Sequence, residues 1–292
     1  MQNGRASRTA EHNALFRALE TSRPSVARPA TDPYAAGFLS PPLRAVDLLA
    51  RTGPGHRLAT AVIDRAWPGV RGSVVARTRL IDDLVTDIAG RVDQVVLLGA
   101  GFDSRAHRLA PLREPAVFEV DHPDTQARKR ARLPAAPGVN DAVRYVPVDF
   151  QRDDLDASLR DAGFDLGRPA LLLWEGVTNY LSESSVDETI RWCAGTAAGS
   201  ELVFTYVDRR VLDDPAAFHR ADRVLATSRR VGEALTFGLD PAETAPWLQA
   251  RGLALRSDLG AADYRRTYYG DRARLIRGHE FYRVAHAVVA GT

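Results

Sequence analysis

Val95-Val96-Leu97-Leu98-Gly99-Ala100-Gly101-Phe102-Asp103-Ser104-Arg105 is the stretch that decides the fold, because an apolar run enters a glycine turn there. A continuous apolar run is typical of a buried parallel strand, and residues 94–98 have this character. Glycines at positions 99 and 101 allow a sharp backbone turn, and they let a ligand approach where a Cβ atom would block it. The stretch therefore predicts a buried strand followed by a turn that faces a ligand.

An acidic residue stands at the distance that such a turn requires. Asp121 follows Gly99 by 22 positions and ends a second apolar run, residues 116–120. In open α/β sheets, ligands bind at the carboxyl ends of the parallel strands, and an acid at this spacing holds ribose hydroxyls. The turn and the acid together predict a crevice that binds a nucleoside.

The centre of the chain alternates between strand-like and helix-like segments. Strands are expected at 94–98, 117–120, 143–148, 170–174 and 201–207, with helices at 103–112, 123–133, 155–162 and 184–196. This alternation is typical of a parallel sheet covered by helices on both faces. After residue 207 the pattern changes to a charged helical segment, 208–238, a helix at 243–251, and strands at 253–258 and 281–289. The last two strands predict a terminal hairpin with one strand antiparallel to the rest.

The first 73 residues show no such alternation. Apolar residues at helical spacing predict helices at 11–20, 44–50 and 58–67, and a further helix at 74–89 leads into the first strand. We therefore expect an N-terminal helical cap or arm, residues 1–73, and a ligand-binding domain, residues 74–292. Within that domain, residues 208–240 are the approximate span of a lid or substrate wall.

Three acids and the glycine turn occupy successive strand ends. Asp121, Asp149 and Glu175 each follow one of the predicted strands. Carboxylates suit a cationic nucleoside, whereas they would repel a diphosphate, which requires donors and positive charge. Taken singly, each acid could instead be a helix cap or a loop residue. Together they favour a nucleoside ligand that carries positive charge.

Composition excludes several other classes of protein. The 292 residues carry 39 basic and 37 acidic side chains, a formal net charge of +2, so no overall basic character indicates nucleic-acid binding. The basic run at 128–132 is interpreted as a solvated helix face. The single cysteine, Cys193, excludes an internal disulfide and a cysteine-rich zinc site, and we expect no metal. No apolar stretch reaches about 20 residues, the length of a membrane span, and the polar N-terminus predicts a cytoplasmic protein.

Four sequence blocks resemble a known family. The blocks VVLLGAGFDSRAHRL (95–109), VFEVDHPDTQARKRARL (117–133), YVPVDF (145–150) and LLLWEGVTNYLS (171–182) resemble the signatures of S-adenosylmethionine-dependent methyltransferases of the leucine carboxyl methyltransferase superfamily. Within it, the bacterial branch with the tetracenomycin-type polyketide O-methyltransferases is the most similar. The resemblance implies an α/β, Rossmann-like class I methyltransferase fold with a seven-stranded, mostly parallel sheet whose last strand is antiparallel.

The resemblance also implies roles for residues around the cofactor, S-adenosylmethionine. The turn would wrap the methionine part, Asp121 would hold the ribose, the segment after the third strand would meet the adenine, and Glu175 would face the amino-acid end or the adjoining pocket. Arg77 would grip the cofactor carboxylate, with Arg79 as the alternative register. The implied cofactor-binding residues are Arg77, Gly99, Ala100, Gly101, Asp121, Asp149, Phe150 and Glu175.

One feature of the family is missing from this chain. Eukaryotic members use a lysine in the N-terminal cap, but the only lysine here is Lys129. The resemblance therefore implies that the contact is lost or is made by an arginine, for which Arg28 is a candidate.

Methyl transfer from a sulfonium is an in-line displacement, in which the enzyme positions the nucleophile and excludes water. A carboxylate acceptor is already ionised and needs only cations or donors, such as arginines, Tyr180 or Tyr34. A hydroxyl acceptor needs a base. His122 is the best-placed candidate for that base, followed by His107, and the alternative for each is a loop or packing histidine. The candidate catalytic residues are therefore His122 and Tyr180.

The predicted function is methyl transfer to an oxygen, a carboxylate in the first place, of a small natural-product-like acceptor. Trp174, Tyr180 and Tyr206 are candidates for an aromatic pocket wall or for the core. Two alternatives stay open: a methyltransferase that acts on the C-terminal carboxyl group of a partner protein, and a protein that binds the cofactor without transferring a methyl group. The sequence does not define the oligomeric state.

Overall fold

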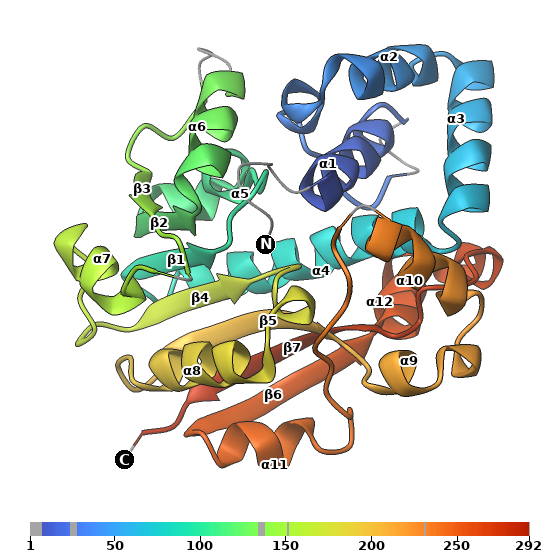
Figure 1. Ribbon diagram of the computed structural model, residues 1–292. Coiled ribbons are helices and arrows are strands. Elements are labelled where there is room, and N and C mark those ends of the chain that lie inside the picture. Colours follow the sequence, from blue (N-terminus) through green and yellow to red (C-terminus); the bar gives the residue numbers. More distant parts are fainter. Residues whose placement is uncertain (1–7, 24–27, 134–137, 151, 231, 292) are drawn as a thin grey trace.

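The computed structural model describes residues 8–23, 28–133, 138–150, 152–230 and 232–291. A seven-stranded sheet in the order β3-β2-β1-β4-β5-β7-β6 forms the centre of the molecule (Figure 1). Six strands share one direction, and β7 is antiparallel to its neighbours β5 and β6, which confirms the predicted fold class. The strands are β1 Gln94–Leu98, β2 Ala116–Asp121, β3 Arg144–Pro147, β4 Ala170–Trp174, β5 Glu201–Val207, β6 Leu253–Gly260 and β7 Tyr282–Val289.

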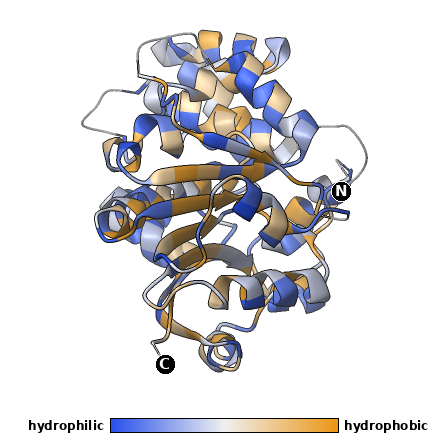
Figure 2. Cartoon of the chain, turned by 90° about the vertical axis from the view of Figure 1, so that its left-hand side faces the viewer, coloured by the Kyte–Doolittle hydropathy of each residue, from blue (hydrophilic) through white to orange (hydrophobic). Residues whose placement is uncertain are grey.

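Helices cover both faces of the sheet, as the apolar character of its central strands requires. All five residues of β1 are buried. Val95 and Leu97 pack in one apolar cluster with α1 and α4, whereas Val96 and Leu98 pack in another with α7 and α8. Figure 2 shows the apolar strands between helices that turn their hydrophilic sides outward.

The helices begin and end close to the predicted positions in most cases. They are α1 Arg8–Thr21, α2 Pro41–Ala50, α3 Gly53–Ala66, α4 Val70–Ala89, α5 Arg105–Arg108, α6 Pro123–Arg132, α7 Leu155–Asp161, α8 Glu183–Ala194, α9 Arg210–Asp213, α10 Ala221–Arg230, α11 Thr244–Gln249 and α12 Ala261–Tyr269. Helices α1 to α3 lie over one end of α4 (Figure 1), and their buried side chains belong to the same apolar cluster as that helix. The boundary predicted at residue 73 stays a prediction.

Two helical predictions were wrong in length because prolines interrupt them. The helix expected at 103–112 is only α5, followed by a 3-10 turn at Ala110–Arg113 that contains Pro111. Proline has no N–H group and fits the first turn of a helix rather than its interior. The segment expected to be helical at 208–238 consists of α9, a 3-10 turn that begins at Pro215, and α10. No sequence prediction covers α12.

The expectation that residues 128–132 form a solvated face was wrong for Lys129. This side chain is 1% exposed, and its Nζ atom pairs with Glu119 Oε2 of β2 at 2.6 Å. Thr125, Gln126 and Lys129 are the buried positions of α6, so they form the face of that helix that packs on the protein. A lysine can bury its aliphatic stem when its ammonium group finds a partner.

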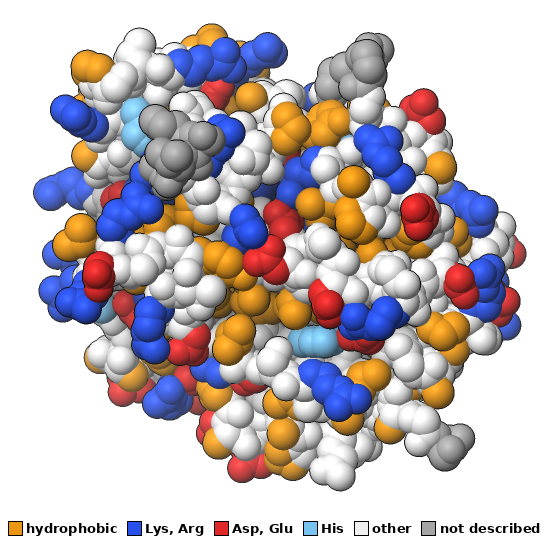
Figure 3. Space-filling view, turned by 180° about the vertical axis from the view of Figure 1, so that it is seen from behind, with side chains coloured by type: hydrophobic (Ala, Val, Ile, Leu, Met, Phe, Trp, Pro, Cys, Tyr) orange, Lys and Arg blue, Asp and Glu red, His pale blue; other side chains and the backbone are white. Residues whose placement is uncertain are grey.

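None of the described helices is long and apolar enough to cross a membrane. On the face seen from behind, lysine and arginine side chains are scattered with aspartate and glutamate among them (Figure 3).

We predict that Lys129→Met destabilises the protein most at high pH. Removing one partner of a buried ion pair costs about 3–5 kcal/mol, because the other charge stays buried alone. Burial already raises the pKa of Glu119 to about 7 despite Lys129, and the variant will raise this pKa further. A carboxyl group whose pKa is raised in the folded state loses stability as the pH rises above its unfolded value of about 4.3.

The measurement is urea unfolding at pH 5 and pH 9. The stability loss relative to the wild type should grow from the lower to the higher pH. Arg128→Met changes an exposed residue of the same helix, and it should cost less than about 0.5 kcal/mol at both pH values. An equal loss for Lys129→Met at both pH values would contradict a charged pair.

Candidate functional site

A cleft of about 450 Å³ opens at the carboxyl ends of β1, β2, β3 and β4. This volume falls in the range of cofactor and small-molecule sites. All ten residues that the sequence analysis selected for the site line this one cleft. They are Arg77, Gly99, Ala100, Gly101, Asp121, His122, Asp149, Phe150, Glu175 and Tyr180. The structure thus brings the selected residues together, and their individual roles stay predictions.

The glycine turn needs both of its glycines. Gly99 has a φ of +64° and Gly101 a φ of +45°, values at which side chains are strained. A Cβ atom on Gly99 would also lie 2.6 Å from Cγ2 of Val177. The turn can therefore bring its backbone to the edge of the cleft only with glycine at position 99.

Asp121 holds the turn in place from the neighbouring strand. Its carboxylate accepts hydrogen bonds from the backbone N–H groups of Gly101, at 2.5 Å, and of His122, at 2.7 Å. Burial raises the pKa of Asp121, although these two N–H groups oppose the effect. A carboxylate has room for about four donors, so Asp121 keeps capacity for donors of a ligand in the cleft.

A network of buried charges lies at the other end of the cleft. The Glu175 carboxylate accepts from Arg77 Nε at 2.7 Å and from Arg105 Nη1 at 2.6 Å. Arg105 also pairs with Asp103 at 2.5 Å and with Asp82 at 2.7 Å. Burial alone would raise the pKa of Glu175, but the two arginines outweigh it and hold this pKa below its ordinary value. Glu175 is therefore a fixed negative charge in the wall of the cleft.

Arg77 and the alternative, Arg79, differ in their access to the cleft. Arg77 is 3% exposed and lines the cleft, and its guanidinium group lies over the ring of Tyr282 at 4.6 Å. Arg79 does not line the cleft, and its half-exposed side chain pairs with Asp83 at 2.8 Å.

Helix α1 contributes a stripe of residues that the sequence analysis missed. Thr9, Asn13 and Arg17 are four positions apart, so they share one face of the helix, and all three line the cleft. Arg17 donates to Asp32 at 2.8 Å and to the carbonyl oxygen of Phe102 at 2.7 Å. The candidate Arg28 was wrong, since it does not line the cleft and instead donates to a backbone carbonyl. The signal in the sequence that could have identified the stripe on α1 was the spacing of its polar residues at i, i+4 and i+8.

The third strand ends in an acid and an exposed aromatic ring. Asp149 and Phe150 both line the cleft on the side of Asp121. Phe150 is 44% exposed, unusual for a phenylalanine next to a sheet. An aromatic face at the rim of a cleft is available for a planar ligand to stack on.

The histidine candidates differ in their access to the cleft. His122 lines it, but its Nδ1 atom accepts from the backbone N–H of Asp124 at 3.2 Å and caps α6. His107 is buried outside the cleft, where burial and then Lys129 lower its pKa to about 4. Its Nδ1 atom accepts from the backbone of Asn140, and its ring lies beside Tyr34. His107 and Tyr34 therefore have packing roles.

The aromatic candidates also differ in whether they line the cleft. Tyr180 and Trp174 line the cleft, although Trp174 is only 1% exposed. Tyr206 lies in the core, where its hydroxyl group donates to Asp258 at 2.6 Å.

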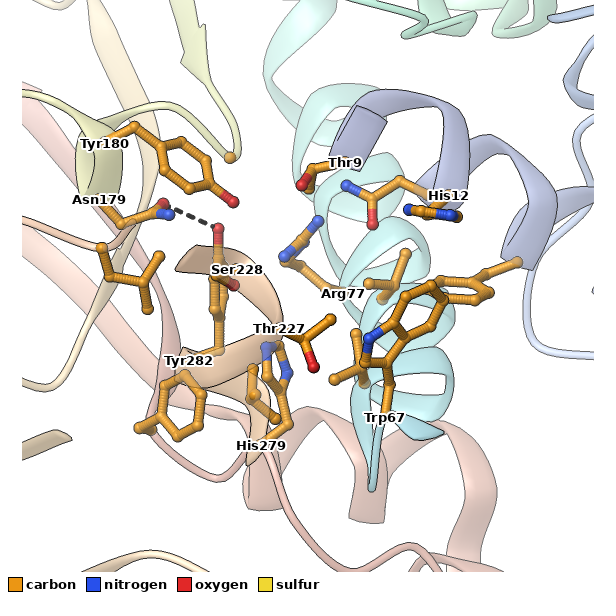
Figure 4. A pocket seen from close by; sticks show the side chains of 18 residues that line it. Thr9, His12, Trp67, Arg77, Asn179, Tyr180, Thr227, Ser228, His279 and Tyr282 are labelled. Carbon is orange, nitrogen blue, oxygen red and sulfur yellow. Dashed lines mark hydrogen bonds between the residues drawn. The ribbon is translucent and has the colours of Figure 1, made fainter. Parts of the chain in front are cut away.

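A second cavity, of about 90 Å³, adjoins the cleft (Figure 4). Both are lined by Thr9, Asn13, Arg77, Gly176 and Tyr180, so the two spaces share a wall. The small cavity lies between α1, α4, α10 and the start of β7. Its other lining residues are His12, Phe16, Trp67, Val70, Val74, Asn179, Val224, Thr227, Ser228, Leu235, His279, Phe281 and Tyr282.

Residues of the segment predicted as a lid or substrate wall line both spaces, and whether it acts as a lid stays a prediction. The hydroxyl group of Thr9 on α1 donates to the carboxylate of Glu233, which follows α10. The backbone N–H of Thr236 donates to the Asn179 carbonyl oxygen at 2.8 Å. These contacts attach the segment after α10 to α1 and to the turn after β4.

With this geometry defined, comparison with known proteins identifies the family. The model of the leucine carboxyl methyltransferase family matches residues 10–194, more than half of the chain. This chain belongs to that family. A relative from Mycolicibacterium smegmatis, provisionally named an S-adenosyl-L-methionine-dependent methyltransferase, is 34% identical over 240 residues that cover 78% of this chain and 74% of the relative. A relative from Frankia alni with a similar name is 36% identical over 211 residues, 70% of each chain.

Solved structures of similar fold cover nearly the whole chain. A protein from Thermobifida fusca, provisionally described as a methyltransferase, aligns with a TM-score of 0.60 and 19% identity over 94% of this chain and 97% of its own. A DUF574 family protein from Streptomyces avermitilis aligns with a TM-score of 0.59 and 18% identity over 92% of this chain and 99% of its own. The N-terminal helices therefore belong to an architecture that other proteins share.

We predict that Asp121→Asn weakens the binding of S-adenosylmethionine by about 10- to 100-fold, since a hydrogen bond to a charged group contributes about 1.5–3 kcal/mol. Isothermal calorimetry measures the dissociation constant. Asp87→Asn, an exposed acid on the outer side of α4, is the control and should bind as the wild type does. Equal affinity in both variants would remove Asp121 from the cofactor site.

Proposed function

We propose that this protein transfers the methyl group of S-adenosylmethionine to an oxygen atom of a small acceptor molecule. The observation that carries the proposal is the pair of adjoining spaces. The large cleft has the size and polar groups for the cofactor, and the small cavity meets it at Arg77 and Tyr180. An acceptor in the small cavity would lie next to the amino-acid end of the cofactor.

The residues present fit the cofactor. Its amino-acid part carries an ammonium and a carboxylate, and the cleft offers the negative Glu175 with its partner Arg77, and Arg17 on α1. The ribose hydroxyls find an acceptor in Asp121, and the adenine ring finds Asp149 and the face of Phe150. S-adenosylmethionine is the cofactor, and when bound it supplies a methyl group on a positively charged sulfur.

The protein contributes to the reaction by positioning the two reactants and by excluding water. Its N-terminal helix α1, the turn after β4 and the segment after α10 enclose the junction between the two spaces. An in-line displacement gains most from holding the two reacting atoms close together and from excluding water. Tyr180 lines both spaces and can orient an acceptor by its hydroxyl group, since burial raises its pKa and keeps it protonated.

The acceptor is proposed to be small, because the cavity volume of about 90 Å³ suits a compact group more than a protein C-terminus. The motif resemblance to the polyketide O-methyltransferases suggests a natural product and a carboxylate oxygen. Among the described lining residues of the small cavity, Arg77 is the only arginine or lysine that could orient a carboxylate. The proposal therefore commits to oxygen, with carboxylate and hydroxyl compounds as the two classes to test.

The experiment combines binding with transfer. Calorimetry should show S-adenosylmethionine binding in the micromolar range. Incubation with pools of small carboxylic acids and hydroxyl compounds should give methylated products by mass spectrometry. Arg77→Gln should weaken binding of the cofactor by about 10-fold or more. Arg79→Gln, two positions away and outside the cleft, should bind within twofold of the wild type.

Each result decides between the alternatives. Absence of cofactor binding would overturn the proposed function. Binding without a methylated product from any pool would favour a protein that binds the cofactor without transferring its methyl group. Methylation of amines alone would retain the methyltransferase and exclude oxygen as the acceptor.

A further inference from the structure

The small cavity contains a histidine that the proposed function does not yet use. His279 lines the cavity and is 5% exposed. Its Nδ1 atom is buried without a hydrogen-bond partner in the part of the chain that the structure describes. An unpaired buried polar atom costs about 1–3 kcal/mol, so such atoms are uncommon and often mark a functional site.

The backbone of His279 is strained as well. Its φ of +63° is one of only two positive values among the described non-glycine residues. Such a conformation costs on the order of 1–3 kcal/mol, and it persists where the surrounding structure leaves no alternative. Strained residues cluster at ligand sites. The strain is an observation independent of the unpaired nitrogen.

Two glycines fix this conformation. A Cβ atom on Gly69 would lie 2.1 Å from the carbonyl oxygen of Gly278, and a Cβ atom on Gly278 would lie 2.6 Å from the carbonyl oxygen of Pro68. The segment before β7 therefore runs backbone against backbone along the start of α4. This contact places Trp67 and His279 in the wall of the same cavity (Figure 4).

The imidazole ring is neutral in this position. Burial lowers the pKa of His279 well below 6.5, and Arg77 from α4 and Arg265 from α12 lower it further. On its own segment, Glu280 accepts from Arg265, and the ring of Tyr282 stacks on the imidazole at 5.0 Å. A neutral imidazole has one N–H donor and one nitrogen lone pair. The lone pair can accept the proton of a hydroxyl group, whereas a carboxylate acceptor is already ionised and has no proton to give.

The other walls fit a ring. Figure 4 shows His279 and Tyr282 on one side and Trp67 on the other, with the hydroxyl groups of Thr227 and Ser228 from α10 nearby. Phe16, Val70 and Val74 add apolar surface. Such a cavity favours a flat apolar molecule with one polar group.

We propose that the small cavity binds a hydroxyl-bearing ring compound of the phenol class, and that His279 accepts the hydroxyl proton during methyl transfer. This inference rests on the proposed function and names its acceptor. A lone pair of the acceptor oxygen forms the bond to the methyl carbon, and the carbon–sulfur bond breaks with its electron pair staying on sulfur. The oxygen–hydrogen bond of the acceptor breaks with its electron pair staying on oxygen, and the proton binds to the imidazole of His279.

The test uses the full chain, with phenol and 1-naphthol as hydroxyl probes and benzoate and 1-naphthoate as their carboxylate partners. The wild type should methylate at least one hydroxyl probe and neither carboxylate. His279→Asn keeps a residue type that tolerates positive φ but cannot take up the proton. It should lower kcat about 100-fold or more, the effect of losing a general base. His56→Asn, on α3 outside both spaces, is the matched control and should keep the wild-type rate.

Two further measurements separate a chemical role of His279 from a structural one. In calorimetry, the His279→Asn variant and the wild type should bind S-adenosylmethionine with the same affinity. The wild-type kcat should fall as the pH decreases through the lowered pKa of His279, and the variant should lack this acid limb.

The outcomes distinguish this inference from the proposed function. Methylation of the carboxylates but not of the hydroxyl probes would overturn the phenol class and leave the methyltransferase intact. A His279→Asn rate within threefold of the wild type would overturn the role of His279. If none of the four probes is methylated, calorimetry with S-adenosylhomocysteine bound decides, since the absence of phenol and 1-naphthol binding would overturn the assignment of the cavity. Absence of cofactor binding would overturn both proposals.

Discussion

The arrangement of the site depends on the carboxylate of Glu175, which two buried arginines share. Arg77 comes from the middle of α4, and Arg105 comes from the segment after the glycine turn. The shared carboxylate therefore connects the ends of β1 and β4 to the long helix that crosses the sheet. Each charge is buried and is stabilised by its partners. Removing one partner would leave the other charge buried alone, which costs several kcal/mol. Arg77 of this network also lines both spaces, so the network lies at the junction between them.

The charges of the cleft match a positively charged ligand. Asp121, Asp149 and Glu175 line the cleft, and Arg77 and Arg105 offset part of the negative charge of Glu175. The remaining fields act in surroundings of low dielectric constant. Methyl transfer removes the positive charge from the sulfur atom, so the product loses part of this attraction. In the proposed function, these acids bind the product less tightly than the reactant cofactor, which favours its exchange for a new reactant.

Much of this architecture follows from local patterns in the sequence. β1, β4 and β5 have the bounds that their apolar runs predicted, because a strand buried on both faces needs continuous apolar residues. The residues at the strand ends meet in one cleft because parallel strands end at the same edge. Lys129 escaped prediction, since its burial depends on Glu119 ten positions away on another element. His279 escaped for the same kind of reason, because it follows a segment whose backbone packs against a part of the chain 209 positions away (residues 69 and 278).

The contact between Gly69 and Gly278 has a consequence for how this protein can diversify. Neither position has room for a side chain, so the parts of the cavity wall next to them, which include Trp67 and His279, cannot be reshaped by substitution there. The part of the wall on α10 presents the side chains of Val224, Thr227 and Ser228. We therefore expect acceptor preference in related chains to vary through α10 rather than through positions 69 and 278.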